Sequence, residues 1–208
     1  LGGYDKNFTY LITCSRTGTQ AIVDAAIDTS EIAQFLRNDP VAILITHGHS
    51  DHIAFLDNFV KEYPGATILG HPDSRLKEGY PNFKKVDNNQ EFIIGEMRFK
   101  CIHTPGHYFD SICYQISPVL FTGDTMFVGR TGRIKGKYSS IEDLYDSIYN
   151  KILKMPGSIK IYPGHDYGDK PNITLEENIL NSPLLSANSL DEFKKRMDDY
   201  EKNRKIGS

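Results

Sequence analysis

The segment THGHSDH at residues 46–52 constrains this chain more than any other part of it. It places four potential metal ligands within six residues, namely His47, His49, Asp51 and His52. The preceding run VAILI, residues 41–45, is typical of a buried strand because it is short, continuous and rich in branched side chains. The apolar residues after the segment indicate a helix. These features predict a strand–loop–helix corner at which imidazole and carboxylate groups converge.

The ligands in this segment can converge only if the backbone turns sharply. Gly48 permits such a turn, and Ser50 is expected to cap the helix that follows. The alternative is a polar loop that contains histidines by chance. The chain has seven histidines, and three of them lie in this one segment. We therefore favour a metal site.

Three later corners repeat the arrangement, in that a predicted strand ends and an ionisable residue stands beside a glycine. The residues delivered there are His107, Asp124 and His165. Strand ends form a rigid site, and glycine lets the backbone approach closely. Any one of these residues alone would more often be structural, so the interpretation depends on the whole set. Histidine and aspartate without cysteine suit zinc, iron or manganese.

Length and charge limit the class of protein. The 208 residues predict a single domain, 1–208, in which two helices at about 174–204 form a short C-terminal extension. The net charge of −3 and the lack of a long Lys/Arg run argue against a nucleic-acid partner. No apolar stretch approaches membrane-spanning length, so we expect no membrane partner. Three scattered cysteines without a CxxC pair indicate buried thiols in a cytoplasmic protein.

Strand and helix signals alternate along the first half of the chain, which predicts an α/β fold. Strands are expected at 8–14, 20–24, 41–45, 66–69, 91–94, 97–103, 111–116, 119–122 and 159–162. Helices are expected after residue 28, from the histidine segment to about residue 63, at 140–153, at 174–180 and at 190–204, with Ser189 capping the last. Residues 70–90 read as an irregular surface segment that overhangs the site.

The pattern HxHxDH, followed by a single His, a single Asp and a final His, resembles the metallo-β-lactamase superfamily of hydrolases. Matching landmarks extend from the first strand to about Leu185. The resemblance implies an αββα sandwich, with two mixed β-sheets flanked by helices and the metals at one edge. The implied ligands are His47, His49 and His107 for a first metal, Asp51, His52 and His165 for a second, and Asp124 as the bridge.

Details of the motifs narrow the branch within the superfamily. Asp124 stands where the best-known lactamases carry Cys, which disfavours antibiotic cleavage. The segments FTGDTMF at 121–127 and PGHDY at 163–167 resemble glyoxalase II and its relatives. Glyoxalase II carries a longer helical C-terminal domain that binds glutathione, whereas only two short helices are expected after His165. The segment GRTGR at 129–133 and the pair Asp166-Tyr167 also resemble persulfide dioxygenases.

The leading hypothesis is a metal-dependent hydrolase that cleaves a small thioester, similar to hydroxyacylglutathione hydrolase. Two divalent metals, zinc first and iron or manganese otherwise, would hold the attacking hydroxide. Asp51 is expected to orient that hydroxide and accept its proton. The alternative is a persulfide dioxygenase with one Fe(II), held by residues that match His47, His107 and Asp124. A structural zinc site is disfavoured, because such sites are closed and four-coordinate.

The expected partner is a small-molecule substrate derived from a thiol. Arg130 and Arg133 follow Asp124 in a glycine-bearing loop, and their guanidinium groups suit an anionic carrier such as glutathione or coenzyme A. A solvated surface pair is the alternative for these arginines. Arg133 is the stronger candidate, because the dioxygenase branch uses an arginine at the matching place. Tyr167 is expected to line the pocket, and a homodimer is one interpretation of the Tyr- and Phe-rich segments.

Overall fold

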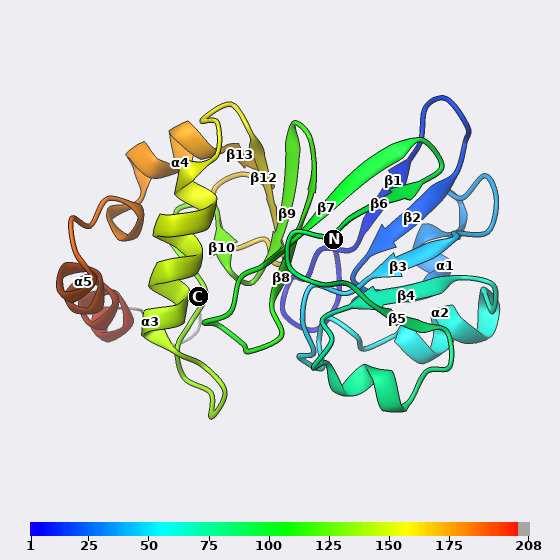
Figure 1. Cartoon of the computed structure of the whole chain (residues 1–208), viewed down its shortest axis with the longest axis horizontal. Helices are drawn as coiled ribbons and strands as arrows, with labels where there is room; N and C mark the ends of the chain where they lie inside the picture. The colour runs from blue at the N-terminus through cyan, green and yellow to red at the C-terminus, as the bar shows by residue number, and fades with distance from the viewer. Residues whose placement is uncertain (204–208) are drawn as a thin grey trace.

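The computed structural model describes residues 1–203 and shows two β-sheets packed face to face, with helices on both outer faces (Figure 1). Residues of both sheets, among them Leu44 and Phe99, share one buried cluster between the sheets. Two further clusters lie between each sheet and its own helices. The predicted sandwich of two mixed sheets flanked by helices is therefore confirmed.

The first sheet has five strands in the order β1-β2-β3-β4-β5. Its strands are β1 (Tyr10–Thr13), β2 (Gln20–Val23), β3 (Ala42–Leu44), β4 (Thr67–Gly70) and β5 (Phe83–Lys85). The first pair is an antiparallel hairpin, as predicted, and the remaining neighbours are parallel. Helices α1 (Thr29–Ala33) and α2 (Leu56–Glu62) cover its outer face. Asp28 caps α1 by accepting a hydrogen bond from Ser30 N at 2.9 Å.

The second sheet has six strands in the order β13-β12-β9-β8-β7-β6. Its strands are β6 (Glu91–Ile94), β7 (Met97–His103), β8 (Ile112–Ile116), β9 (Val119–Gly123), β12 (Lys160–Pro163) and β13 (Ile173–Thr174). Only β9 and β12 are parallel neighbours. The short strands β10 (Met126–Phe127) and β11 (Arg130–Thr131) pair separately, beside the end of β9.

Helical segments from the second half of the chain cover the outer face of the second sheet. They are α3 (Ile141–Tyr145), the π-helical turn Asp146–Lys151, the 3-10 turn Ile152–Lys154, α4 (Leu175–Asn181), the 3-10 turn Pro183–Leu185 and α5 (Leu190–Asn203). Phe193 and Met197 of α5 pack into the same cluster as Leu144 and Ile148. Ser189 Oγ accepts from Glu192 N at 3.2 Å, which confirms the predicted cap.

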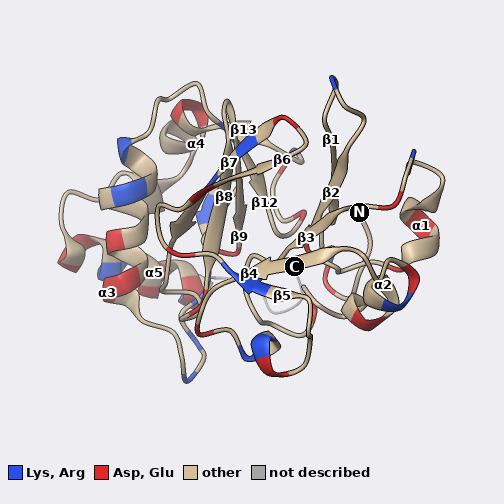
Figure 2. Cartoon of the chain, turned by 45° about the vertical axis from the view of Figure 1, so that its right-hand side comes forward, with Lys and Arg blue, Asp and Glu red and all other residues tan. Residues whose placement is uncertain are grey.

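No helix within residues 1–203 has the length and apolar character needed to cross a membrane. Acidic and basic residues are interspersed over the helices and loops (Figure 2). This mixture is consistent with the small net charge of −3.

Two sequence-based expectations about local structure were wrong. Ser50 does not cap α2, which begins at Leu56 without a side-chain cap. Residues 50–55 instead form a loop held against the end of β2, because Ala25 N donates to His52 O and Phe55 N donates to Ala25 O, both at 2.9 Å. The segment 70–90 is not wholly irregular, since it contains a 3-10 turn at Arg75–Glu78 and strand β5. Strand β5 is short and its lysines are exposed, so it lacks the apolar pattern of a strand.

Tyr114 of β8 connects the second sheet to the ends of β3 and β4. Its side chain is fully buried, and its hydroxyl lies 3.0 Å from Ile45 O and 3.1 Å from Leu69 O. Leu69 O also accepts from Ile45 N at 2.8 Å, so Ile45 O depends more strongly on the tyrosine. Burial raises the pKa of Tyr114 well above its usual value. This hydroxyl therefore fixes the chain one residue before the segment 46–52.

We expect Tyr114→Phe to lower the free energy of unfolding by about 1–3 kcal/mol, because Ile45 O becomes a buried carbonyl without its partner. Urea denaturation followed by circular dichroism measures this change. Tyr80→Phe is the matched control, since it removes a surface hydrogen bond to Asp57 at 2.6 Å. The control should cost less than about 1 kcal/mol. Equal losses in the two variants would contradict the role assigned to Tyr114.

Candidate metal centre

The seven predicted ligands meet at one edge of the sandwich, where several strands end. The segment carrying His47 follows β3, and the loop carrying His107 follows β7. Asp124 follows β9 directly, and His165 stands two residues after β12. The ligand atoms of these residues form three overlapping groups in which all atoms lie within 4.8 Å of one another. The structure thus brings together all seven residues that the sequence motifs predicted as metal ligands.

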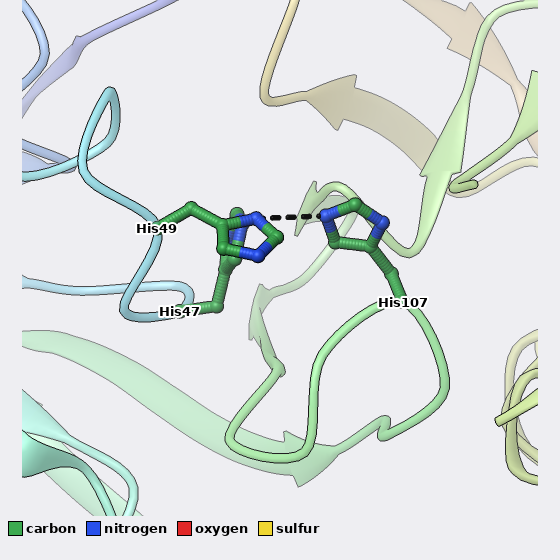
Figure 3. Close-up of side chains that lie close together, drawn as sticks. All are labelled: His47, His49 and His107. Atoms are coloured by element: carbon green, nitrogen blue, oxygen red, sulfur yellow. Dashed lines mark hydrogen bonds between the residues drawn. The ribbon is translucent and has the colours of Figure 1, made fainter. Parts of the chain in front are cut away.

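The first group consists of His47, His49 and His107, whose rings point toward one another (Figure 3). His49 Nδ1 lies 3.0 Å from His47 Nε2 and 3.0 Å from His107 Nε2. The HxH spacing therefore presents two different ring nitrogens to one point. Three imidazole nitrogens that converge in this way match the donor set that zinc and iron prefer.

The second group consists of Asp51, His52 and His165. His52 Nε2 lies 3.1 Å from His165 Nε2, and His165 Nε2 lies 3.3 Å from Asp51 Oδ2. His52 and His165 are buried, whereas Asp51 is partly exposed. This group offers two nitrogens and one oxygen, which again suits a divalent metal.

Asp124 lies between these two groups and forms the third group with His47 and His52. Its Oδ1 is 3.1 Å from His52 Nε2, and its Oδ2 is 3.3 Å from His165 Nε2 and 3.5 Å from His107 Nε2. Although His52 is near, Oδ1 makes no hydrogen bond of good geometry within residues 1–203 and is buried. A buried carboxylate oxygen without a hydrogen bond is costly, and a bound cation would remove that cost. The donor set therefore fits metal ions.

Three of the five ligand histidines are held in place through the ring nitrogen that faces away from the centre. His52 Nδ1 lies 2.7 Å from Asp24 Oδ2, His107 Nδ1 lies 2.9 Å from Arg133 O, and His165 Nδ1 lies 2.7 Å from Asp5 O. An oxygen acceptor keeps the proton on Nδ1 and turns the Nε2 lone pair toward the centre. This arrangement is the usual support for a histidine that ligates a metal.

The charges of the centre also favour a cation. Burial and neighbouring imidazoles lower the pKa of His49 to about 4 and that of His47 well below its usual value. Burial alone would raise the pKa of Asp124, but His52 and His165 outweigh it and hold the carboxyl ionised. Burial disfavours a charged His52, yet Asp124 and Asp24 raise its pKa. A metal would take the place of that proton.

Two supporting residues escaped the sequence analysis. Asp24 is buried and accepts from Thr46 N and Thr46 Oγ1, both at 2.8 Å, in addition to its contact with His52. An acidic residue directly after the buried strand QAIV was a usable signal for it. Asn7 donates from Nδ2 to Asp51 Oδ2 at 2.8 Å. That contact spans 44 residues of sequence and leaves no local pattern.

Two glycines are required at the site because the backbone passes too close to another side chain for a Cβ atom to fit. A Cβ on Gly164 would lie 2.4 Å from Asp124 Oδ1 and 2.6 Å from His52 Cε1. A Cβ on Gly48 would lie 3.0 Å from Asp110 Oδ2, while Gly48 N donates to Asp110 Oδ1 at 3.1 Å. Gly48 has no positive φ, so the close approach to Asp110 is what requires it, rather than the conformational freedom expected from sequence.

Arg130 and Tyr167 lie beside the metal centre, and Arg133 lies at its rim. Together with His107, Asp124, Phe127, Thr131 and Tyr200 they line one hollow. The ring of Tyr167 stacks on His165 with a centroid distance of 4.6 Å, and Arg130 lies over the Tyr167 ring at 4.1 Å. Arg133 contributes its carbonyl to His107, while its side chain is half exposed. Their roles in substrate binding stay predictions.

We expect Asp24→Asn to weaken metal binding at the second group by about 10–100-fold, because the amide no longer offers the charge that orients His52. Chelator competition on the metal-loaded protein, with metals counted per chain, measures the loss. Asp39→Asn removes an exposed carboxylate and should leave the affinity unchanged. Equal affinities in the wild type and Asp24→Asn would contradict the assignment.

Comparison with known proteins agrees with this geometry. The family model described as the metallo-beta-lactamase superfamily matches residues 2–165. A probable polyketide biosynthesis zinc-dependent hydrolase of Bacillus subtilis is 28% identical over 179 residues, which cover 82% of this chain and 78% of that protein. A hydroxyacylglutathione hydrolase of Francisella tularensis subsp. novicida is 34% identical over 168 residues. That match covers 78% of this chain and only 64% of the Francisella enzyme.

A solved structure has a similar fold. The crystal structure of ETHE1 from Myxococcus xanthus superposes with a TM-score of 0.85 and 27% identity, covering 94% of this chain and 86% of that one. The family match, the sandwich and the converging ligands all agree. The chain therefore belongs to the metallo-β-lactamase superfamily.

Proposed function

We propose that this chain is a metal-dependent hydrolase that cleaves a small thioester and uses two divalent cations, zinc in the first place. The observation that carries the proposal is the pair of ligand groups that share Asp124. One group supplies three imidazoles, the other supplies Asp51, His52 and His165, and the Asp124 carboxylate lies within 3.5 Å of both. The names of two relatives, a zinc-dependent hydrolase and a hydroxyacylglutathione hydrolase, support it.

The chemistry of a thioester suits the groups that the centre offers. Two cations bound there would lower the pKa of water and stabilise the negative charge that develops on the carbonyl oxygen. A thiolate leaves without being protonated more readily than an amine or alkoxide, because the pKa of a thiol is about 8.5. The centre therefore needs a proton acceptor and no separate acid for the leaving group.

Asp51 is the proton acceptor that we assign. Asn7 and the neighbouring imidazoles hold its Oδ2, and we assign the uptake of the proton to the other carboxylate oxygen. Burial raises the pKa of Asp51, but the charge of His52 and the hydrogen bond from Asn7 together lower it by more. The net pKa lies below its usual value, so the carboxyl stays ionised. Its side chain is 28% exposed, so a proton can pass on to solvent.

The second candidate is a persulfide dioxygenase that holds one Fe(II) with His47, His107 and Asp124. The packing of Tyr167 favours it, because its ring lies parallel to His165 and also contacts Phe127, which covers one side of the second group. An aromatic cover of this kind suits a single-iron pocket in which the second group stays without metal.

We also propose a cytoplasmic location, which the three unpaired, buried cysteines support.

Metal content and two assays separate the candidates. The protein is purified without added metal, metals are counted per chain, and hydrolysis of S-lactoylglutathione is assayed beside oxygen uptake with glutathione persulfide. We expect two metals and thioester cleavage without oxygen uptake. One iron per chain, oxygen uptake and no thioester cleavage would overturn the proposal in favour of the dioxygenase. Silence in both assays would reject glutathione as the carrier.

A pair of variants tests the same choice from the side of the ligands. For a two-metal hydrolase, His165→Ala and His107→Ala should each remove about one metal per chain and lower kcat by at least about 100-fold. For a single-iron enzyme, only His107→Ala should have that effect, because His165 belongs to the second group. Full metal content and full activity in His107→Ala would contradict both assignments.

A further inference from the structure

We propose that Glu201 of α5 sets the specificity for the thiol carrier, by neutralising two cations at the rim and leaving Arg130 to bind a single carboxylate. A carrier that presents one carboxylate at this place is accepted, and a carrier with several phosphates is disfavoured. The inference rests on the proposed thioester hydrolysis, but it concerns carrier binding, which can be measured without turnover.

The hollow between the metal centre and α5 is small. Its walls run from His107 and Asp124 at the centre to Arg130 and Tyr200, and its volume is about 40 Å³. Since one water occupies about 10–15 Å³ of such volume, the hollow holds roughly three non-hydrogen atoms. A carboxylate group has that size, so a larger anionic group such as a chain of phosphates would lie outside the hollow, at its rim.

Arg130 is fixed in place and has an unused donor. Its Nη1 donates to Tyr200 Oη at 3.0 Å, and its guanidinium lies over the ring of Tyr167. Its Nε is buried and has no hydrogen-bond partner within the part of the chain that the structure describes. Arg130 also forms no ion pair with any described residue. Arg130 lines the hollow, and a guanidinium there without an anionic partner among the described residues indicates a site for an anionic oxygen.

Two further cations lie within ion-pair distance of Glu201, namely Arg133, which lines the hollow, and Lys135, which does not. Lys135 Nζ lies 2.6 Å from Glu201 Oε2, and Arg133 Nε lies 3.9 Å from Glu201 Oε1. Glu201 is 20% exposed, which makes its charge less screened than that of a fully exposed residue. Among the described residues, Arg130 is therefore the one cation lining the hollow that has no anionic partner.

This pairing discriminates between carriers by charge. A single carboxylate needs only Arg130 to bind. Its affinity therefore increases little when Arg133 and Lys135 lose their ion pairs with Glu201. A polyphosphate needs several cations and would bring its own negative charge close to Glu201, which repels it. Removing the Glu201 charge should therefore favour the polyanionic carrier selectively.

The test measures binding of two thioethers, S-methylglutathione and S-methyl-coenzyme A, to the metal-loaded protein by calorimetry at low salt. We expect Glu201→Gln to tighten S-methyl-coenzyme A binding by about fivefold or more, which corresponds to about 1 kcal/mol. S-methylglutathione should change by less than about twofold. Arg130→Gln should weaken S-methylglutathione by about tenfold or more, since it loses a charged hydrogen bond.

Asp199→Asn is the matched control, because it removes the same charge from an exposed position of α5, about half a turn of the helix away. It should leave both affinities unchanged, and thermal melts should show that all variants are folded. Equal shifts for both ligands in Glu201→Gln, no shift for either, or no binding of either ligand to any variant would overturn the inference. If the thioethers behave as expected but no thioester is cleaved, the proposed hydrolysis fails and the assignment of Glu201 stands.

Discussion

The arrangement of this molecule depends on one buried carboxylate, Asp124, which lies within 3.5 Å of three imidazoles. Burying a charge among polar groups is costly unless each group has a partner. The surroundings meet that demand in two ways. Gly164 lets the backbone pass the carboxylate, and Asp24 fixes the nearest ring, that of His52.

Most of the fold and of the ligand set could be predicted from sequence, because the signals are local. The segment 46–52 contains four ligands within six residues, Asp124 directly follows an apolar strand, and His165 stands two residues after another. The hairpin of β1 and β2 and the cap at Ser189 likewise follow from short patterns. A local signal of this kind is readable because the chemistry and the backbone turn lie in the same few residues.

The rest could not be predicted because it depends on contacts distant in sequence. Asn7 reaches Asp51 across 44 residues, and Arg130 reaches Tyr200 across 70. Strand β13 has only two residues and is defined by its pairing with β12. A strand this short has no alternation of apolar and polar residues from which it could be predicted. The motifs favoured Arg133 over Arg130 as the anion ligand, and both arginines line the hollow, where Arg130 also contacts Tyr200 of α5. Tertiary packing decides such cases.

The hydroxyl of Tyr114 has a consequence for how the protein responds to its surroundings. It joins the core between the sheets to Ile45 O, and His47 follows only two residues later. Occupancy of the centre and cooperative folding are therefore thermodynamically linked, so by mass action any ion held there raises the melting temperature in proportion to the logarithm of its concentration. Chelation and heating then act on one equilibrium, because both draw the protein away from the folded, metal-bound state.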